Sequence, residues 1–385
     1  MYDVTVIGPA VIDVLAAPYD ADAFSRGADF SRYMDGIRMS YGGDALNEST
    51  VLTRLGKKVQ LISRIGEDEA GRSILGHLKN NGISTESISV QEGLDTSVNI
   101  ALIAGDGSRK FLMNRNSSLR SLGPDDVLPY FRRSSGAQFS CGQASVGQSS
   151  PGQASVGQSS PGQAPFKQDP HAQIPGQPVR RDTAEIVSFA SMFISPLFTI
   201  DGMKELFAAV KAAGKTLVVD MTRPKNGETI DDLRELLPYI DVFVPNDEEI
   251  SALTGEQDPE KNARLLVEAG VGTAVVKTGG DGCIIGTGCS FTGCSFTGAE
   301  TKMRGGNREV QILHVPAVPG IRCVDTTGAG DTFAAGFIAG LCNGWGAAEC
   351  ARLGCAAASC SIEQIGATDG VRTLEQVMER YAMLL

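Results

Sequence analysis

Short apolar runs rich in Val and Ile alternate along this chain with stretches whose apolar residues recur every three or four positions. The first pattern predicts buried strands and the second predicts amphipathic helices. Strands are predicted at residues 4–7, 59–65, 186–194, 216–220, 242–244 and 274–277. Helices are predicted at residues 44–55, 69–80, 202–213 and 261–269. This alternation indicates an α/β fold with a mostly parallel sheet covered by helices on both faces.

Two further runs, at residues 98–103 and 109–114, do not alternate with helices. They flank the turn sequence Gly105-Asp106-Gly107-Ser108, which predicts an antiparallel hairpin. A hairpin of this kind stands outside a parallel sheet. We therefore expect a small β lid, built from about residues 14–40 and 95–117.

One long segment fits no packed fold. The sequence GQASVGQSSP at residues 142–151 is repeated identically at 152–161, and the composition stays rich in Gly, Gln, Ser and Pro to residue 178. Such a segment buries too little apolar area to offset its ordering entropy. We predict a disordered insertion over 134–182 and a smaller loop expansion over 286–307, both within a single domain of residues 1–385.

The overall charge narrows the possible partners. A net charge of −11 and a pI near 4.9 argue against nucleic acid and anionic membranes. No apolar run approaches the length of a membrane span, and the first residues lack a basic stretch. With no secretory signal, six of the nine cysteines are most simply buried thiols: Cys283, Cys323, Cys342, Cys350, Cys355 and Cys360. We expect a cytoplasmic protein.

The most informative motif is Asp325-Thr326-Thr327-Gly328-Ala329-Gly330-Asp331, which leads into an apolar helix. The first N–H groups of a helix have no partner within it, so a glycine turn at this point can bind an anion. A carboxylate such as Asp331 would repel a bound phosphate. It fits the position if it takes a proton from a hydroxyl that attacks the phosphate. The motif therefore predicts phosphoryl transfer to an alcohol.

Polar residues also mark the start of the chain. Gly42 and Gly43 precede a helix that carries Asn47 one turn in, where its amide offers a donor and an acceptor. An ordinary strand-to-helix turn with Asn47 as a cap explains the same residues. Asp13 closes an otherwise apolar opening strand, at the end that faces the ligand crevice in α/β sheets. It can bind two sugar hydroxyls, or it can cap the following turn.

Two motifs lie in the second half. Asn246 and Glu249 are three residues apart and share a helix face, which suits Mg²⁺ bound largely through water. Taken alone, the pair is explained more simply by an acidic helix N-terminus that complements the helix dipole. Lys277 ends a strand before a turn containing Gly279 and Gly282, which either passes beside nucleotide phosphates or makes a hairpin. A P-loop sequence is absent from the chain.

Taken together, these residues resemble the ribokinase-like (PfkB) carbohydrate kinases. The resemblance covers nearly the whole chain outside the two insertions. It implies an α/β three-layer sandwich with a central mostly parallel sheet and a small β lid. Two signatures carry it, one around Gly42, Gly43 and Asn47 and one at 325–331. Between and beside them come Leu55-Gly56, Ile65-Gly66-x-Asp68-x-x-Gly71, Asp220, the Asn246 and Glu249 pair, and the turn at 277–282.

The resemblance also implies a role for each matching position. Asp331 corresponds to the general base, and Gly328, Ala329 and Gly330 to the anion hole. Asp13, Gly42, Gly43 and Asn47 correspond to sugar-binding positions, and Lys277, Gly279 and Gly282 to the nucleotide side. Asn246 and Glu249 correspond to residues that organise Mg²⁺, mostly through water. Many members bind a monovalent cation such as K⁺, which would lie at Asp325 and the Thr327 carbonyl.

The implied activity is transfer of the γ-phosphate of ATP, with Mg²⁺, to a primary hydroxyl of a ribose-, fructose- or sugar-acid-like acceptor. Two departures leave the acceptor and the nucleotide open: Thr222 follows Asp220 where several members have Asn, and Cys355 lies near the expected adenine position. A nucleoside kinase is one alternative, with Phe111, Tyr33 and Tyr41 as candidate base contacts. A catalytically silent sugar-binding protein is another. Lids of this type often pair, which implies a homodimer.

Overall fold

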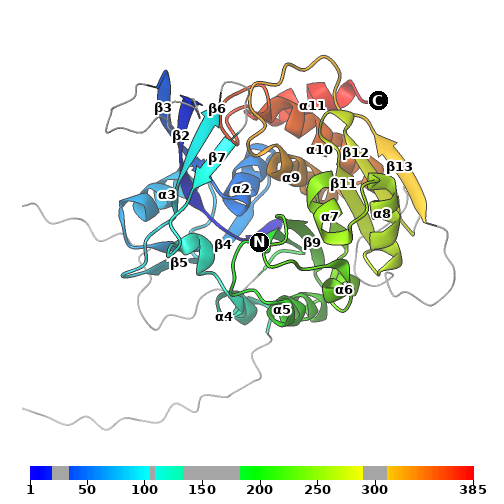
Figure 1. Cartoon of the computed structure of the whole chain (residues 1–385), viewed down its shortest axis with the longest axis horizontal. Coiled ribbons are helices and arrows are strands. Elements are labelled where there is room, and N and C mark those ends of the chain that lie inside the picture. The colour runs from blue at the N-terminus through cyan, green and yellow to red at the C-terminus, as the bar shows by residue number, and fades with distance from the viewer. Residues whose placement is uncertain (20–33, 105–108, 133–182, 289–309) are drawn as a thin grey trace, which may run out of the picture.

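The computed structural model describes residues 1–19, 34–104, 109–132, 183–288 and 310–385. Nine strands form the main sheet in the order β13-β12-β11-β10-β9-β8-β1-β4-β5. All neighbouring strands from β11 to β5 are parallel, while β12 and β13 extend the sheet antiparallel at one edge. The predicted mostly parallel sheet is confirmed. Figure 1 shows the helices around it and the small sheet to one side.

The strands of the main sheet are short and buried. They are β1 Val4–Ile7, β4 Val59–Gly66, β5 Ile88–Gln91, β8 Ile186–Met192, β9 Thr216–Met221, β10 Val242–Phe243, β11 Thr273–Lys277, β12 Cys283–Thr287 and β13 Gln311–Val315. The helices are α2 Asp44–Arg54, α3 Glu69–Asn80, α4 Pro124–Val127, α5 Ile200–Ala212, α6 Ile230–Leu233, α7 Asp247–Thr254, α8 Pro259–Glu268, α9 Ala329–Cys342, α10 Ala347–Ser361 and α11 Leu374–Ala382. The predicted helix at 69–80 matches α3, and the other predicted bounds differ from these by one or two residues.

The helices form two layers, one on each face of the main sheet. Side chains of α2, α3, α9, α10 and α11 make one apolar cluster with the sheet, and those of α4 to α8 make the other. Successive residues of a strand point to opposite faces. In β9, Val218 therefore joins the first cluster while Leu217 and Val219 join the second. The result is the three-layer α/β sandwich expected from the sequence.

Four strands form a separate small sheet in the order β3-β2-β6-β7: β2 Val11–Tyr19, β3 Gly36–Gly42, β6 Val98–Ala104 and β7 Arg109–Leu112. Strands β6 and β7 pair antiparallel, as the sequence predicted for residues 98–103 and 109–114. The predicted turn between them, 105–108, lies outside the described residues. The small sheet lies beside the main sheet (Figure 1), and its role as a lid stays a prediction.

The opening strand differs from the prediction. It is two strands in two sheets, β1 and β2, separated by Gly8-Pro9-Ala10. Gly8 has a φ of 152°, and a Cβ there would lie 2.9 Å from the Cβ of Ala45. The backbone turns at this glycine because α2 comes close to it. Asp13 therefore lies within the small sheet and does not end a strand of the main sheet.

The two predicted insertions fall largely outside the described residues. The segment 134–182 lies entirely outside them. The expansion predicted at 286–307 begins later than expected, because Gly286 and Thr287 still pair with Ile312 and Gln311 in β12 and β13. Within the described residues, none of the helices is both long enough and apolar enough to cross a bilayer.

Candidate active site

The first turn of α9 holds the carboxylate predicted to be the general base. Asp331 lies three residues after the N-cap Gly328, and the helix that follows it is buried up to Leu341 and apolar from Phe333. The amide Nδ2 of Asn47 in α2 donates a hydrogen bond of 2.7 Å to Oδ2 of Asp331. The Oδ1 atom of Asn47 is buried and has no protein partner. The two principal sequence signatures, 284 residues apart, therefore meet at one hydrogen bond.

The turn before Asp331 requires glycine. Gly328 has a φ of 68°, in the left-handed region, and a Cβ there would lie 2.6 Å from the Cβ of Ala367. A Cβ on Gly330 would lie 3.2 Å from Nζ of Lys277. The N–H of Ala329 contacts the carbonyl of Thr326 at 3.3 Å. The bare backbone at Gly330 thus faces a lysine ammonium, which suits a site for phosphate oxygens.

A buried ion pair lies at the carboxyl edge of the main sheet. Asp220 near the end of β9 accepts a 2.6 Å hydrogen bond from Nζ of Lys277 at the end of β11. Both side chains are buried, and strand β10 lies between their strands. Burial disfavours the ammonium, but the carboxylates of Asp220, Glu249 and Asp331 together outweigh it and raise the pKa of Lys277. Lys277 is therefore a fixed positive charge beside Gly330.

Asn246 and Glu249 form a reciprocal cap at the start of α7. Oδ1 of Asn246 accepts from the N–H of Glu249 at 2.8 Å, and Oε2 of Glu249 accepts from the N–H of Asn246 at 3.0 Å. This is the simpler of the two sequence explanations, a capped helix N-terminus. The cap also lies in the site, because Asn246 bridges to Lys277 in the sheet. The structure thus shows the cap, and the part of this pair in binding Mg²⁺ stays a prediction.

Asp13 and Gly42 meet in the small sheet. A Cβ on Gly42 would lie 1.9 Å from Oδ2 of Asp13, so only glycine lets the carboxylate lie against this backbone. Asp13 is 8% exposed, and its Oδ1 accepts a 3.0 Å hydrogen bond from Nδ2 of Asn99. A Cβ on the neighbouring Gly43, at φ 89°, would lie 2.7 Å from the carbonyl of Pro9. The predicted acceptor-binding positions are thus adjacent at the start of α2.

The sequence assigned no role to Asn99, although it is a polar residue on the buried side of a strand. Asn99 pairs in register with Asp13 across β2 and β6 and fixes its carboxylate. The sequence does contain one indication of its role, because Asn99 is a polar residue in an otherwise apolar strand. Its importance depends on which strand lies beside it, and that pairing is long-range.

Two acids of α2 were also missed. Asp44 accepts a hydrogen bond from Oγ of Ser191, and Glu48 accepts one of 2.7 Å from Oγ of Ser188, both in β8. Glu48 is 1% exposed and its Oε1 has no protein partner. Burial raises the pKa of Glu48 well above its usual range. The pattern 44, 47, 48 places all three polar side chains on one face of α2.

The carboxylates around the site strongly affect one another. Burial, followed by the negative charge of Asp44, raises the pKa of Asp331 to about 8. Burial likewise raises the pKa of Asp44 to about 6 and that of Glu249 to about 7. Carboxyl groups with raised pKa values are typical of sites that move protons near neutral pH.

The remaining predicted positions lie in the loop before α9 and in the turn after β11. Oδ1 of Asp325 accepts from the N–H and the hydroxyl of Thr327, and Oδ2 accepts from the N–H of Gly366 at 3.0 Å. These bonds hold the loop before α9. Gly279 is exposed at the turn after β11, whereas a Cβ on Gly282 would lie 2.1 Å from the carbonyl of Val315. Gly282 is therefore required by the close approach of the chain after β13.

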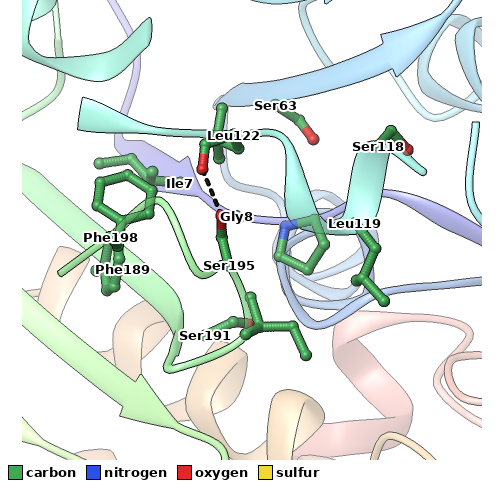
Figure 2. Close-up of a pocket in the computed structure, with 12 residues that line it drawn as sticks. Ile7, Gly8, Ser63, Ser118, Leu119, Leu122, Phe189, Ser191, Ser195 and Phe198 are labelled. Atoms are coloured by element: carbon green, nitrogen blue, oxygen red, sulfur yellow. Dashed lines mark hydrogen bonds between the residues drawn. The ribbon is translucent and has the colours of Figure 1, made fainter. Parts of the chain in front are cut away.

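A small cavity, shown in Figure 2, lies next to Pro9, whose carbonyl comes close to Gly43. Gly8, Pro9 and Ser191 line it, together with Ser63, whose hydroxyl is buried without a protein partner. The space open to the centre of a water molecule is about 10 Å³, which accommodates roughly one water. The cavity is too small for a sugar ring. It suits a water molecule that would form a hydrogen bond with the hydroxyl of Ser63, close to Ser191, which donates to Asp44.

Of the three candidate aromatic contacts for a base, one faces the site. Phe111 pairs with Ala101, on the same face of the small sheet as Asp13, and is 47% exposed. Tyr41 lies on the opposite face, where its ring stacks on His77 of α3 at 4.0 Å between centroids. Tyr33 lies outside the described residues.

Chemically, the site combines a carboxylate base, a lysine ammonium and a glycine turn at a helix N-terminus, which are the parts that phosphoryl transfer to an alcohol needs. The family model of the pfkB family carbohydrate kinases matches residues 1–131 and 167–374. The chain belongs to this family. As a member of the pfkB family it is a phosphotransferase with an alcohol acceptor.

Individual relatives agree with the family assignment. An uncharacterised sugar kinase of Archaeoglobus fulgidus is 25% identical over 83% of this chain and 97% of its own length. The ribokinase of Haemophilus influenzae is 24% identical over 89% of this chain and 87% of its own. The structure of Arabidopsis thaliana ribokinase complexed with ribose and ATP has a TM-score of 0.67 at 20% identity, covering 99% of this chain and 98% of its own. At that identity the structural likeness shows the fold.

Proposed function

We propose that this pfkB-family kinase transfers the γ-phosphate of ATP to a primary hydroxyl of a small carbohydrate. The observation that carries the proposal is the contact between Asn47 and Asp331 at the N-terminus of α9. The contact brings an amide that can bind a hydroxyl and a carboxylate that can accept a proton together beside the glycine turn, which supports the proposal. The ATP complex of the Arabidopsis relative supports ATP as the phosphoryl donor.

On the acceptor side, Asp13, with Gly42, Gly43 and Asn47, binds the sugar hydroxyls. Asn99 holds the carboxylate of Asp13 in place. The free Oδ1 of Asn47 accepts a hydrogen bond from the acceptor, while its Nδ2 orients Asp331. Asp331 removes the proton as the hydroxyl oxygen attacks phosphorus. A positioned base of this kind contributes about 10²–10⁴-fold to the rate.

On the phosphate side, the N–H groups of Gly328, Ala329 and Gly330 stabilise charge on the γ-phosphate, as anion-hole donors do. Lys277 adds a fixed positive charge beside Gly330. The exposed turn at Gly279, followed by Gly282, borders the nucleotide. Closure of the small sheet over the site would exclude water and favour transfer over ATP hydrolysis.

The donor set fits a magnesium ion that keeps most of its own water. Within the described stretches of the chain, no three His, Cys, Asp or Glu side chains converge as metal ligands. Oxygens of Asn246 and Glu249 already serve the helix cap, which leaves contact through water as the natural mode for both. When bound, the ion neutralises charge on the phosphates of ATP. Asn246 and Glu249 would orient its water shell.

A monovalent cation at Asp325 and the Thr327 carbonyl stays a prediction. The carboxylate of Asp325 already accepts from Thr327 and Gly366, so a cation would share oxygens that brace the loop. Activity in K⁺ and in tetramethylammonium, at equal ionic strength, measures the contribution of such an ion.

The acceptor is identified by ADP release across pentoses, ketohexoses, sugar acids and nucleosides, with Asp331→Asn as the blank. Turnover of one carbohydrate above the blank supports the proposal. Turnover of nucleosides alone would replace it with a nucleoside kinase, for which the exposed Phe111 on the Asp13 face is the supporting observation. No turnover, with retained binding of sugar, would indicate a silent sugar-binding protein.

The outer face of the small sheet supports the predicted homodimer. Met39, Val14, Ile100 and Leu112 are aligned across the four strands, and Met39 and Leu112 are 71% and 57% exposed. A contiguous apolar face of this kind favours association with a second copy. Sedimentation of the wild type and of Met39→Glu tests it, with a dimer expected for the first and a monomer for the second.

The free state of the six described cysteines supports a reducing compartment, the cytoplasm.

A further inference from the structure

Residues 366–371, here called the backing segment, pack against the glycine turn before α9. A Cβ on Gly328 would lie 2.6 Å from the Cβ of Ala367 and 2.7 Å from its carbonyl oxygen, so the two stretches of backbone are in direct contact. The N–H of Gly366 also donates a 3.0 Å hydrogen bond to Oδ2 of Asp325, at the start of the same motif. The position of the backing segment therefore constrains where the turn at Gly328 lies.

Arg54, the last residue of α2, holds the backing segment in place. Its Nη1 donates one hydrogen bond to the carbonyl of Thr368 and another, of 2.9 Å, to the carbonyl of Val371. The arginine side chain is half-buried, and hydrogen bonds from a charged donor are stronger than those between neutral groups. Because one guanidinium joins two carbonyls three residues apart, it fixes both ends of the segment's last turn.

Helix α2 thus acts on the start of α9 at two points. Asn47 donates directly to Asp331, whereas Arg54 acts through the backing segment. Positions 47 and 54 are seven residues apart, which places them two turns apart on the same side of the helix. One helix therefore orients the predicted base and braces the predicted anion hole.

We propose that Arg54 is a positioning residue for phosphoryl transfer. Its two hydrogen bonds keep the backing segment against Gly328 and so keep the anion-hole N–H groups aimed at the transferred phosphate. This inference rests on the proposed function, because it assigns Arg54 a part in the anion hole proposed there. Since Arg54 acts through backbone, its loss should lower kcat and leave the KM for the acceptor and the Kd for Mg²⁺-ADP largely unchanged.

The test uses Arg54→Met, which keeps a long side chain and removes both hydrogen bonds. Full-length protein is assayed for kcat and KM by ADP release with the carbohydrates of the panel. Calorimetry without acceptor gives the Kd for Mg²⁺-ADP, with and without aluminium fluoride. Aluminium fluoride beside ADP mimics the phosphoryl group during transfer, so the affinity it adds reports on the anion hole without turnover. We expect kcat and this added affinity each to fall about tenfold or more.

Arg264→Met is the matched control. Arg264 is also half-buried, and its Nη1 donates a 2.9 Å hydrogen bond to the backbone carbonyl of Val310, beside the edge strand β13. Its loss should lower stability in denaturant unfolding but leave kcat and the effect of aluminium fluoride unchanged. If Arg54→Met does not fold, Arg54→Lys takes its place, because it keeps the charge without the planar guanidinium. Its kcat should fall, with the Kd for Mg²⁺-ADP unchanged.

Unchanged kcat and an unchanged effect of aluminium fluoride in a folded Arg54 variant would overturn the inference, as would an equal loss of kcat in Arg264→Met. Absence of ADP release by the wild type with every carbohydrate would overturn the proposed function instead. The effect of aluminium fluoride would then still decide the role of Arg54. A wild type that gains no affinity from aluminium fluoride would count against both the anion hole and the role of Arg54.

Discussion

At the scale of single residues, the account depends on Asp331 and the acids around it. Burial and the charge of Asp44 raise the pKa of Asp331 to about 8, so the ligand-free enzyme holds this carboxyl largely protonated at neutral pH. The base is active only when deprotonated. The hydrogen bond from Asn47 favours the charged form and partly opposes the shift.

The pH dependence of kcat/KM follows from this pKa. Because activity needs the deprotonated form, kcat/KM should rise with pH and level off above about 8. In Asp44→Asn the rise should occur at lower pH, since a neighbouring negative charge has been removed. Steady-state kinetics between pH 5.5 and 9.5 measure both curves. A flat profile for the wild type would argue against Asp331 as the base.

The buried Glu48 gives a separate prediction about stability. The pKa of Glu48 is raised in the folded protein, so protonation of this side chain stabilises the fold. This stabilisation is complete below the ordinary pKa of a glutamate and is lost as the pH rises through the pKa of Glu48 in the folded protein. Glu48→Gln should therefore raise the melting temperature at pH 8.5 by a few degrees and leave it nearly unchanged at pH 4.5. Calorimetry at the two pH values compares them. A larger effect at pH 4.5 would reverse the assigned sign.

At the scale of elements, the start of α9 does most to place the chemistry. The left-handed Gly328 turns the chain against Ala367 and sends the first N–H groups and Asp331 toward α2. The same helix ends near Gly344, which is also left-handed at φ 74° but has open space around its missing Cβ. The two glycines share a backbone conformation and differ in what surrounds them.

This difference makes a matched pair of variants. Gly344→Ala should cost about 1–2 kcal/mol of stability from the backbone alone and leave kcat unchanged. Gly328→Ala has the same backbone cost and adds a clash with Ala367, so it should lower the free energy of unfolding further. It should also lower kcat at least about tenfold, because the clash displaces the anion-hole donors. Denaturant unfolding and ADP release give the two quantities. Equal effects of both substitutions would contradict the role assigned to the turn.

At the scale of the whole molecule, the local patterns identified most helices and strands and both principal signatures. They could not show which elements are neighbours. The contact between Asn47 and Asp331 spans 284 residues, and the pair Asp220 and Lys277 spans 57. The division of the opening strand between two sheets depends on how closely α2 approaches Gly8. The environment of Asp44 depends on its hydrogen bond with Ser191 of β8. These are tertiary facts that no local pattern contains.

The family match omits residues 132–166, which contain both copies of the ten-residue repeat. Deleting residues 142–161 should leave kcat, KM and the melting temperature unchanged, because the described site draws on none of them. Activity and thermal unfolding of the shortened chain measure this. A clear loss of either would give the repeats a role in the fold or in catalysis.

The most direct test of the central claim is turnover by Asp331→Asn, with the best acceptor of the panel. The replacement keeps the shape of the side chain and removes its ability to take a proton. We expect kcat to fall by about 10²-fold or more, with the calorimetric Kd for Mg²⁺-ATP largely unchanged. Turnover close to that of the wild type would contradict the assignment of Asp331 as the base and, with it, the proposed mechanism.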